Sequence, residues 1–262
     1  MLFLYILFSI TMLTKNQSKR IRALAIKKYR ENYGEFVAEG DKIIKELTSS
    51  NYQIKEIYST PTWLEKNSHL LPQNCPKFPI TLKELKSISR QINPNQALAI
   101  VKIPEEKKAP NPENQLTLIL DNIQDPGNMG TIIRTAEWFG VKHLICSDDT
   151  VDLYNPKVIQ STMGSFCRVE IWYTDLASYL EKYIDKVPIY GSFLDGYNAF
   201  NISFPKNAII VIGNESKGIS QKTEKYISKK VTIPPYYTEI DKKPESLNAS
   251  VATGILLAIM RM

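Results

Sequence analysis

The stretch AIIVIGNESKG, residues 208–218, places an apolar run directly before a polar loop that contains glycine. The run from Ala208 to Ile212 predicts a buried β-strand, and Gly213 at its tip would let a ligand approach the backbone closely. Glu215 would then lie at the mouth of a site, where it could hold a cation or orient a basic side chain. A turn with a solvated glutamate is the common alternative.

Two other strand candidates end in loops of the same kind. TLILD (117–121) leads through NIQDPG into a helical stretch in which Asn128 suits the N-cap position and Arg134 lies about two turns further on. VTIP (231–234) is followed by a polar loop and by ESLNAS (245–250), where Ser246 or Asn248 can cap the last helix. Helix capping explains one residue of each loop but not the whole cluster of small polar groups.

From residue 116 onward, short apolar runs alternate with helical patterns. Buried strands separated by helices favour a parallel sheet covered on both faces, and ligands of such sheets bind beyond the carboxyl ends of the strands. We expect strands at 117–121, 141–147, 188–193 and 207–213, and helices at 127–139, 155–164, 175–183 and 246–261.

The first part of the chain predicts a smaller α/β unit. Ile43, Ile44 and Leu47 recur with helical spacing within 36–50, and a second helix is expected at 80–89. Strands are expected at 54–60 and 97–104. The Pro- and Asn-rich stretch PEEKKAPNPENQ (104–115) has no apolar periodicity and is typical of a linker. The expected division is an apolar extension at 1–14, a domain at 15–104, a linker at 105–115 and a domain at 116–262.

The composition describes a globular chain of 262 residues with 43% hydrophobic and 23% charged residues. Its net charge of 33 − 27 = +6 is concentrated in one helix-sized segment, since seven basic and no acidic residues lie between Lys15 and Arg30, and the remainder sums to 6 − 7 = −1. This segment is either a solvated helix face or an arm that contacts phosphates. If the segment is such an arm, Lys19, Arg20, Arg22, Lys27 and Lys28 would contact RNA phosphates.

Several kinds of site are excluded by the residue patterns. Cys75, Cys146 and Cys167 are far apart and form no metal-ligand pair with either histidine, so neither a disulfide framework nor a metal site is expected, and a reducing cytoplasm fits best. The sequence contains no GxGxxG after a strand and no P-loop. A cofactor without a phosphate chain therefore remains possible.

The run MLFLYILFSITML at the start is too short to span a bilayer and has no basic residues ahead of it. We expect residues 1–11 to be a mis-set translation start or a disordered extension, with a membrane anchor as the alternative. No stable association with a membrane is expected.

The three loops together resemble the motifs of the SpoU branch of the SPOUT superfamily, the TrmH-like RNA 2'-O-ribose methyltransferases. The matching segments are NMGTIIRTA (128–136), IGNESKG (212–218), and Ile233-Pro234 with SLNAS (246–250). FVAEG (36–40) is similar to the substrate-binding domain of this family, which resembles ribosomal protein L30. The chain departs from the family in a longer loop at 234–246 and in Ala249, where valine is common.

The resemblance implies an α/β fold whose C-terminal segment forms a deep trefoil knot, and a homodimer built through the knotted domain. The last helix, with Val251, Ile255, Leu256 and Ile259, would supply core or interface. The resemblance also implies S-adenosylmethionine as cofactor, held by Leu194, Gly213, Ile233 and Leu247. The catalytic set that it implies is Asn128, Arg134, Glu215, Ser246 and Asn248, with Arg134 nearest the reacting hydroxyl and no metal.

The function that follows is methylation of a ribose 2'-hydroxyl in RNA, with 23S-type ribosomal RNA preferred. Two alternatives stay open: methylation of transfer RNA, and a non-catalytic RNA-binding protein of ribosome assembly that keeps the same fold.

Overall fold

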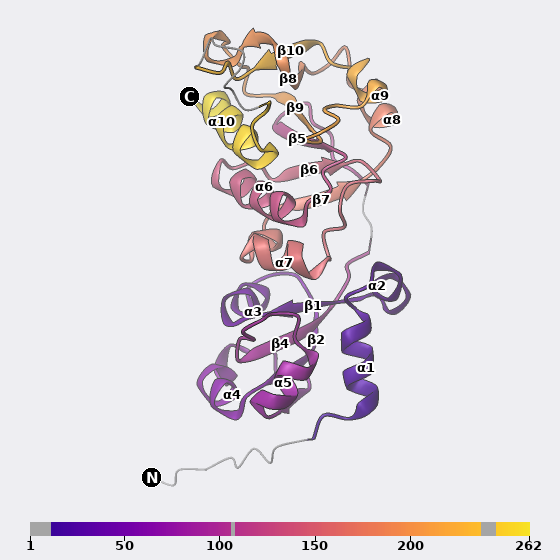
Figure 1. Ribbon diagram of the computed structural model, residues 1–262, viewed down its shortest axis with the longest axis vertical. Helices are drawn as coiled ribbons and strands as arrows, with labels where there is room; N and C mark the ends of the chain where they lie inside the picture. Colours follow the sequence, from indigo (N-terminus) through magenta and orange to yellow (C-terminus); the bar gives the residue numbers. More distant parts are fainter. Residues whose placement is uncertain (1–11, 106–107, 237–244) are drawn as a thin grey trace. The chain divides into compact units, whose positions relative to one another are not determined.

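The computed structural model describes residues 12–105, 108–236 and 245–262. The chain forms two compact units: unit 1 takes in the chain up to Glu105 together with Tyr154–Cys167, and unit 2 takes in Glu106–Leu153 and Arg168–Met262 (Figure 1). The expected boundaries at 104 and 115 stay a prediction. The apolar extension up to residue 11 and much of the long loop at 234–246 lie outside the described residues.

Unit 1 contains a four-stranded sheet in the order β1-β4-β2-β3, in which β4 runs antiparallel to both of its neighbours. The strands are β1 (Glu35–Glu39), β2 (Ile54–Ser59), β3 (Lys77–Pro79) and β4 (Ala97–Lys102). The helices are α1 (Lys15–Ala23), α2 (Lys27–Tyr33), α3 (Asp41–Thr48), α4 (Pro61–Asn67), α5 (Leu82–Ile88) and α7 (Pro156–Thr162), with short 3-10 turns η1 (Ser68–Leu70) and η2 (Ser165–Cys167).

The small α/β unit expected from the sequence is confirmed in its main elements. Ile43, Ile44 and Leu47 are the buried face of α3, but FVAE before them is a strand, so the helix starts only after Gly40. The basic segment is not one helix: a turn at 24–26 separates α1 from α2. Helix α7 belongs to this unit although it lies far along the chain. Tyr154 before it and Phe166 after it pack against Phe36, with ring centroids 4.6 and 6.1 Å apart, over separations of 154 − 36 = 118 and 166 − 36 = 130 residues.

Unit 2 contains a sheet in the order β10-β8-β9-β5-β6-β7, and each strand of this sheet runs parallel to its neighbours. The strands are β5 (Leu116–Asp121), β6 (His143–Cys146), β7 (Glu170–Tyr173), β8 (Ile189–Asn198), β9 (Ala208–Gly213) and β10 (Lys229–Thr232). The helices are α6 (Pro126–Trp138), α8 (Leu176–Glu181), α9 (Gln221–Glu224) and α10 (Ala249–Arg261), with η3 (Ala199–Asn201). The predicted parallel sheet is therefore confirmed.

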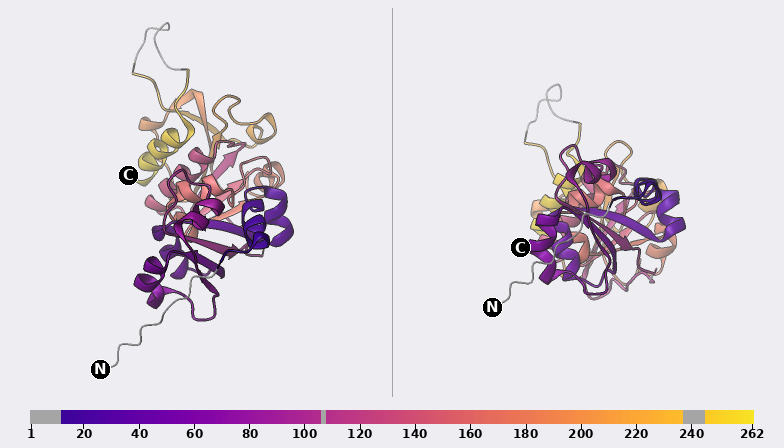
Figure 2. Two further views of the ribbon diagram at one scale, coloured as in Figure 1. Left: turned by 60° about the horizontal axis from the view of Figure 1, so that its bottom comes forward. Right: turned by 90° about the horizontal axis from the view of Figure 1, so that it is seen from below.

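Helices cover both faces of this sheet. Helices α6 and α10 lie side by side on one face, and α8 and α9 lie on the other (Figures 1 and 2). Alternate residues of the central strands face the two layers: Ile119, Ile209 and Val211 pack with Leu180 of α8. All six residues of β5 are buried, and each large apolar side chain among them stabilises the fold by about 1.5–3 kcal/mol. Strand β7 was not expected, because its residues at the sheet edge show no clear alternation of burial.

Candidate active site

The loops after β5 and β9 begin side by side. These strands are parallel neighbours, and Asp121 at the end of β5 lies opposite Gly213 at the end of β9. The two loops are also joined directly, because the Asn214 Nδ2 donates a hydrogen bond to the Asn122 carbonyl oxygen over 2.8 Å. Sequence reasoning missed both asparagines. Their signal was local: Asn122 has a φ of 59°, a conformation that asparagine tolerates better than most residues.

Asn128 lies at the centre of the network that these loops form. Its Nδ2 donates a hydrogen bond to the Glu215 Oε1, and its Oδ1 accepts one from the Asn248 Nδ2 over 2.9 Å. The three residues come from α6, from the loop after β9 and from the start of α10. One amide side chain therefore links all three of the polar loops noted in the sequence.

Asn248 is the N-cap of α10, as one of the two capping alternatives predicted. Its Oδ1 accepts hydrogen bonds from the Ser250 and Val251 backbone amides over 3.0 and 3.4 Å, while its Nδ2 binds Asn128. The cap thus fixes the orientation of the amide that faces Asn128. Ser246, the other alternative, is exposed and has no hydrogen bond to the described residues.

The prediction that Asn128 caps α6 is wrong. Asp125 is the N-cap, and its Oδ1 accepts the hydrogen bond from the Asn128 backbone amide over 2.8 Å. Pro126 occupies the first helical position, where its missing amide costs nothing. Asn128 therefore sits inside the first turn, and its side chain is free to bind Glu215 and Asn248 instead of the helix end.

Arg134 does not join this network. It follows Asn128 by six residues, which turns it about 120° away around α6. Its side chain is exposed and makes no hydrogen bond or ion pair with residues 12–105, 108–236 or 245–262. The Arg134 guanidinium is therefore available to bind a ligand that approaches from the surface.

Gly213 is required by the chain itself. A Cβ atom there would lie 2.3 Å from the Gly218 carbonyl carbon, because Asn214 and Gly218 pair through backbone hydrogen bonds of 2.8 and 3.1 Å. The sequence predicted that a ligand approaches the Gly213 backbone closely. In the structure, the backbone of the turn that follows Gly213 occupies the space beside its Cα atom. Gly218, with a φ of +69°, closes that turn.

The remaining residues expected to hold a cofactor lie at the same edge of the sheet. Leu194 belongs to β8 and is 73% exposed, and its carbonyl oxygen accepts a hydrogen bond from Thr232 Oγ1, which stands next to Ile233. Leu247 is 45% exposed and directly precedes the Asn248 cap. Exposed aliphatic side chains beside main-chain groups, without a charge among them, fit an uncharged aromatic ring such as adenine.

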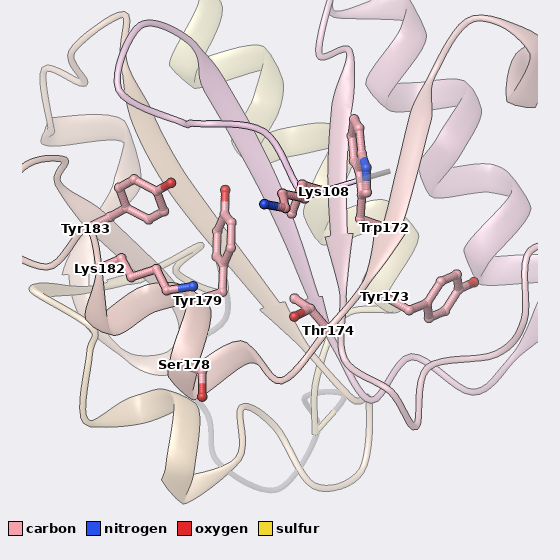
Figure 3. A pocket seen from close by; sticks show the side chains of 9 residues that line it. Lys108, Trp172, Tyr173, Thr174, Ser178, Tyr179, Lys182 and Tyr183 are labelled. Carbon is pink, nitrogen blue, oxygen red and sulfur yellow. The ribbon is translucent and has the colours of Figure 1, made fainter. Parts of the chain in front are cut away.

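A separate pocket of about 480 Å³ lies between β7 and α8 in unit 2 (Figure 3). It contains none of the residues predicted for the site, and the Tyr173 ring at its border points away from the other side chains. Its main lining residues are Lys108, Trp172, Thr174, Tyr179, Lys182 and Tyr183.

The other candidate reactive groups lie outside the loops described above. Complete burial raises the pKa of the Cys146 thiol, which therefore stays protonated and unreactive. Burial lowers the pKa of His143, which lies on β6 away from the loops. The described residues contain no cluster of His, Cys, Asp and Glu that could hold a metal ion. None of their helices is long and apolar enough to cross a membrane.

The basic residues proposed as an RNA arm differ in their availability. Lys19, Arg22, Lys27 and Lys28 are exposed. Arg20 instead forms ion pairs with Glu35, over 3.3 Å, and with Glu56, so much of its charge is neutralised inside unit 1. Any contact of this segment with an anion would therefore depend on the other four.

Comparison with protein families gives two matches along the chain. Residues 115–258 match the SpoU rRNA Methylase family, and residues 15–99 match the MRM3-like substrate binding domain. The first match spans the strands and loops that carry Asn128, Glu215 and Asn248. The second covers most of unit 1.

Individual proteins are similar over nearly the whole chain. The 23S rRNA (guanosine(2553)-2'-O)-methyltransferase RlmP of Bacillus subtilis is 29% identical over 94% of this chain and 97% of its own length. A TrmH-family structure from Porphyromonas gingivalis is 34% identical, with a TM-score of 0.87 over 96% of this chain and 99% of that one. The AdoMet-bound rRNA methyltransferase of Sinorhizobium meliloti is 26% identical, with a TM-score of 0.82 over 96% of each chain.

Proposed function

The chain belongs to the SpoU rRNA methylase family, and from this premise we propose that it methylates a ribose 2'-hydroxyl of ribosomal RNA, with 23S-type RNA preferred. The observation that carries the proposal is the link from Asn128 to both Glu215 and Asn248, which ties together the three loops that carry the family motifs. The B. subtilis relative, whose name specifies a guanosine 2'-O position of 23S rRNA, supports the choice of substrate.

S-adenosylmethionine, which the S. meliloti relative binds, would supply an electrophilic methyl group on sulfur. The residues present fit it: Leu194 and Leu247 offer exposed aliphatic surface, and Gly213 and Ile233 offer main-chain groups at the same edge of the sheet. Methyl transfer forms a bond from the ribose 2'-oxygen to the methyl carbon, breaks the carbon–sulfur bond and releases the hydroxyl proton. A site for this reaction must align the hydroxyl and help remove its proton.

Asn128 and Glu215 would position the reactants. The Glu215 carboxylate accepts a hydrogen bond from the Asn128 Nδ2, so the Oδ1 end of the Asn128 side chain points to Asn248. The Asn128 amide is thereby held in one orientation and can present a hydrogen bond to the ribose. Ser246, exposed next to this network, would complete the pocket.

Arg134 would bind the phosphate beside the target ribose and polarise the 2'-hydroxyl. Arginine keeps its charge at any ordinary pH, so a role in binding and polarising fits it better than that of a free base. The bound phosphate can assist removal of the proton. The lack of an internal partner for Arg134 in the described chain supports this assignment, because its five donors remain unused.

Three further features belong to the same proposal. The segment that ends in α10 would pass through a loop to form the trefoil knot of the family, and two chains would pair through this domain. Trp138 on α6 and Val251 on α10, which are 85% and 49% exposed, provide apolar surface for such a pairing. With cysteines that are few and far apart in the sequence, and with bacterial relatives, we assign the protein to the cytoplasm.

Methyl transfer from radiolabelled S-adenosylmethionine tests the proposal directly. Unmodified ribosomal RNA should accept label, and transfer RNA should accept little. Arg134→Ala should lower the rate by about 10²-fold or more while cofactor binding is kept. Lys142→Ala, which removes another exposed cation of unit 2, is the matched control and should keep full activity. Full activity of Arg134→Ala, or binding of cofactor without transfer by the wild type, would contradict the proposal.

A further inference from the structure

Helix α2 is held to unit 1 by a buried arginine. Arg30 is 3% exposed, and its Nη1 donates a hydrogen bond to the Leu24 carbonyl oxygen over 2.8 Å. Gly34 ends the helix in the left-handed conformation, with a φ of 63°. The attachment of α2 thus runs through its one buried residue, and the rest of the helix is left to face outward.

Two aromatic rings occupy the outward side of α2. Tyr29 and Tyr33 are four residues apart, so they share a face, and their rings stack at a centroid distance of 6.5 Å with 19° between the planes. They are 40% and 50% exposed, and Ile26 just before the helix is 55% exposed. Tyrosines placed in this way contribute little to the core, and grouped exposed apolar side chains typically mark a binding surface.

The exposed charges of α2 outside the two rings sum to a positive value. Lys27 and Lys28 directly precede Tyr29 and are exposed, and Glu31 is the one acidic residue of the helix. Glu31 pairs with Lys27 over 3.8 Å, in a fully solvated geometry that neutralises it weakly.

We infer that the exposed surface of α2, which carries the stacked rings of Tyr29 and Tyr33 and the charges of Lys27 and Lys28 around the helix, binds an unpaired segment of the substrate RNA, whose bases stack on the two rings. The inference rests on the proposed function, which makes RNA the substrate. Lysines alone would suit any nucleic acid, because phosphates are the same in duplexes and single strands. Stacking rings favour unpaired bases, whose faces a duplex does not expose.

The test compares two RNAs on the full-length chain by fluorescence anisotropy. One is a hairpin with a single-stranded loop of about a dozen nucleotides, and the other is a fully paired duplex of matched length. Tyr29→Leu with Tyr33→Leu should weaken hairpin binding about tenfold or more and leave duplex binding unchanged. Tyr29→Phe with Tyr33→Phe keeps both rings and should bind like the wild type.

Salt dependence separates stacking from charge. The leucine pair should keep the slope of log affinity against log salt, because it removes no cation. Lys27→Gln with Lys28→Gln should reduce the magnitude of that slope by about 1.5 and weaken the binding of both RNAs. Both tyrosines are exposed, so the thermal unfolding temperature should change little in either pair, and this measurement checks that the variants fold.

Three results would overturn the inference: wild-type hairpin binding by the leucine pair, loss of binding by the phenylalanine pair, or absence of RNA binding by the wild type. A surface that bound a protein partner would give the first of these. Failure of the proposed function would look different, since methyl transfer would then be absent while the tyrosine pairs still separated hairpin from duplex.

Discussion

Asn248 uses the two ends of its amide for two tasks at once. The oxygen caps α10, and the nitrogen donates to Asn128. Capping serves stability, and the bond to Asn128 serves the arrangement of the site. A substitution that keeps the first task and removes the second therefore separates folding from function at one residue.

Asn248→Asp is that substitution. Aspartate caps helices about as well as asparagine, so the unfolding temperature should stay near that of the wild type. Its carboxylate cannot donate to the Asn128 Oδ1, and we expect methyl transfer to fall about tenfold or more with fold and cofactor binding kept. The initial rate of methyl transfer and the thermal unfolding temperature of the variant and the wild type are the two measurements.

Asn248→Ala is the control for this prediction. It removes the cap as well, and should lower the free energy of unfolding by about 1 kcal/mol in addition to the loss of rate. Equal activity of Asn248→Asp and wild type would show that the bond between Asn128 and Asn248 has no role in transfer.

At the scale of the element, the turn after β9 depends on Gly213. Gly213→Ala would drive a Cβ into the backbone of Gly218 and Ile219, at 2.3 and 2.4 Å, so the turn that carries Glu215 must move. We expect loss of cofactor binding and of activity, together with a lower unfolding temperature. Calorimetric titration and thermal unfolding measure the two effects.

Gly254→Ala is the matched control within α10. A Cβ there would meet only the Thr135 methyl carbon at 3.8 Å, an ordinary contact. Replacing a glycine inside a helix by alanine should raise the free energy of unfolding by about 0.5–1 kcal/mol. If Gly213→Ala behaved like Gly254→Ala, the turn after β9 would not require glycine.

Helix α5 gives a prediction about pH. The Leu13 backbone amide, over 3.0 Å, and the Thr81 backbone amide, over 2.8 Å, both donate to the Glu84 carboxylate and hold its pKa below the ordinary 4.5. The ionised form is thus favoured by folding, so the stabilisation is present above pH 4.5 and is lost as pH falls through the lower folded pKa.

At neutral pH the unfolding temperature of the wild type should therefore be higher than that of Glu84→Gln. This difference in unfolding temperature should shrink as the pH falls below 4.5. Glutamine keeps one acceptor oxygen at the same position of the capping box, so the variant should still form α5. A difference that stayed constant from neutral to acid pH would contradict the role given to the charge.

At the scale of the whole molecule, the exposed apolar side chains of α6 and α10 predict self-association. Leu256 is buried in the core, as one of the sequence alternatives had it, while Val251 is exposed and Ile255 and Ile259 are partly buried. Val251→Glu should shift sedimentation from dimer toward monomer with little change in the unfolding temperature of the monomer. Ile92→Glu, at a position in unit 1 that is 97% exposed, should leave the dimer unchanged.

The sequence predicted the elements of unit 2 well, because alternation of apolar runs and helical patterns is a local property. The α2 segment shows where this reasoning fails. Nothing in the run of basic residues distinguishes Arg20 and Arg30, which are used inside unit 1, from Lys27 and Lys28, which are exposed. Helical spacing fixes the face of a side chain, but the neighbour on that face comes from another part of the chain.

By itself the sequence determined the parallel α/β class of unit 2, the three polar loops at strand ends, and the chemical type of each residue in them. Only the tertiary structure decided that Asn128 binds Glu215 and Asn248, which are 87 and 120 residues away, and that Asp125 instead of Asn128 caps α6. The reason is physical: periodicity specifies strands, but their order in the sheet, here β9 beside β5, specifies which loops meet.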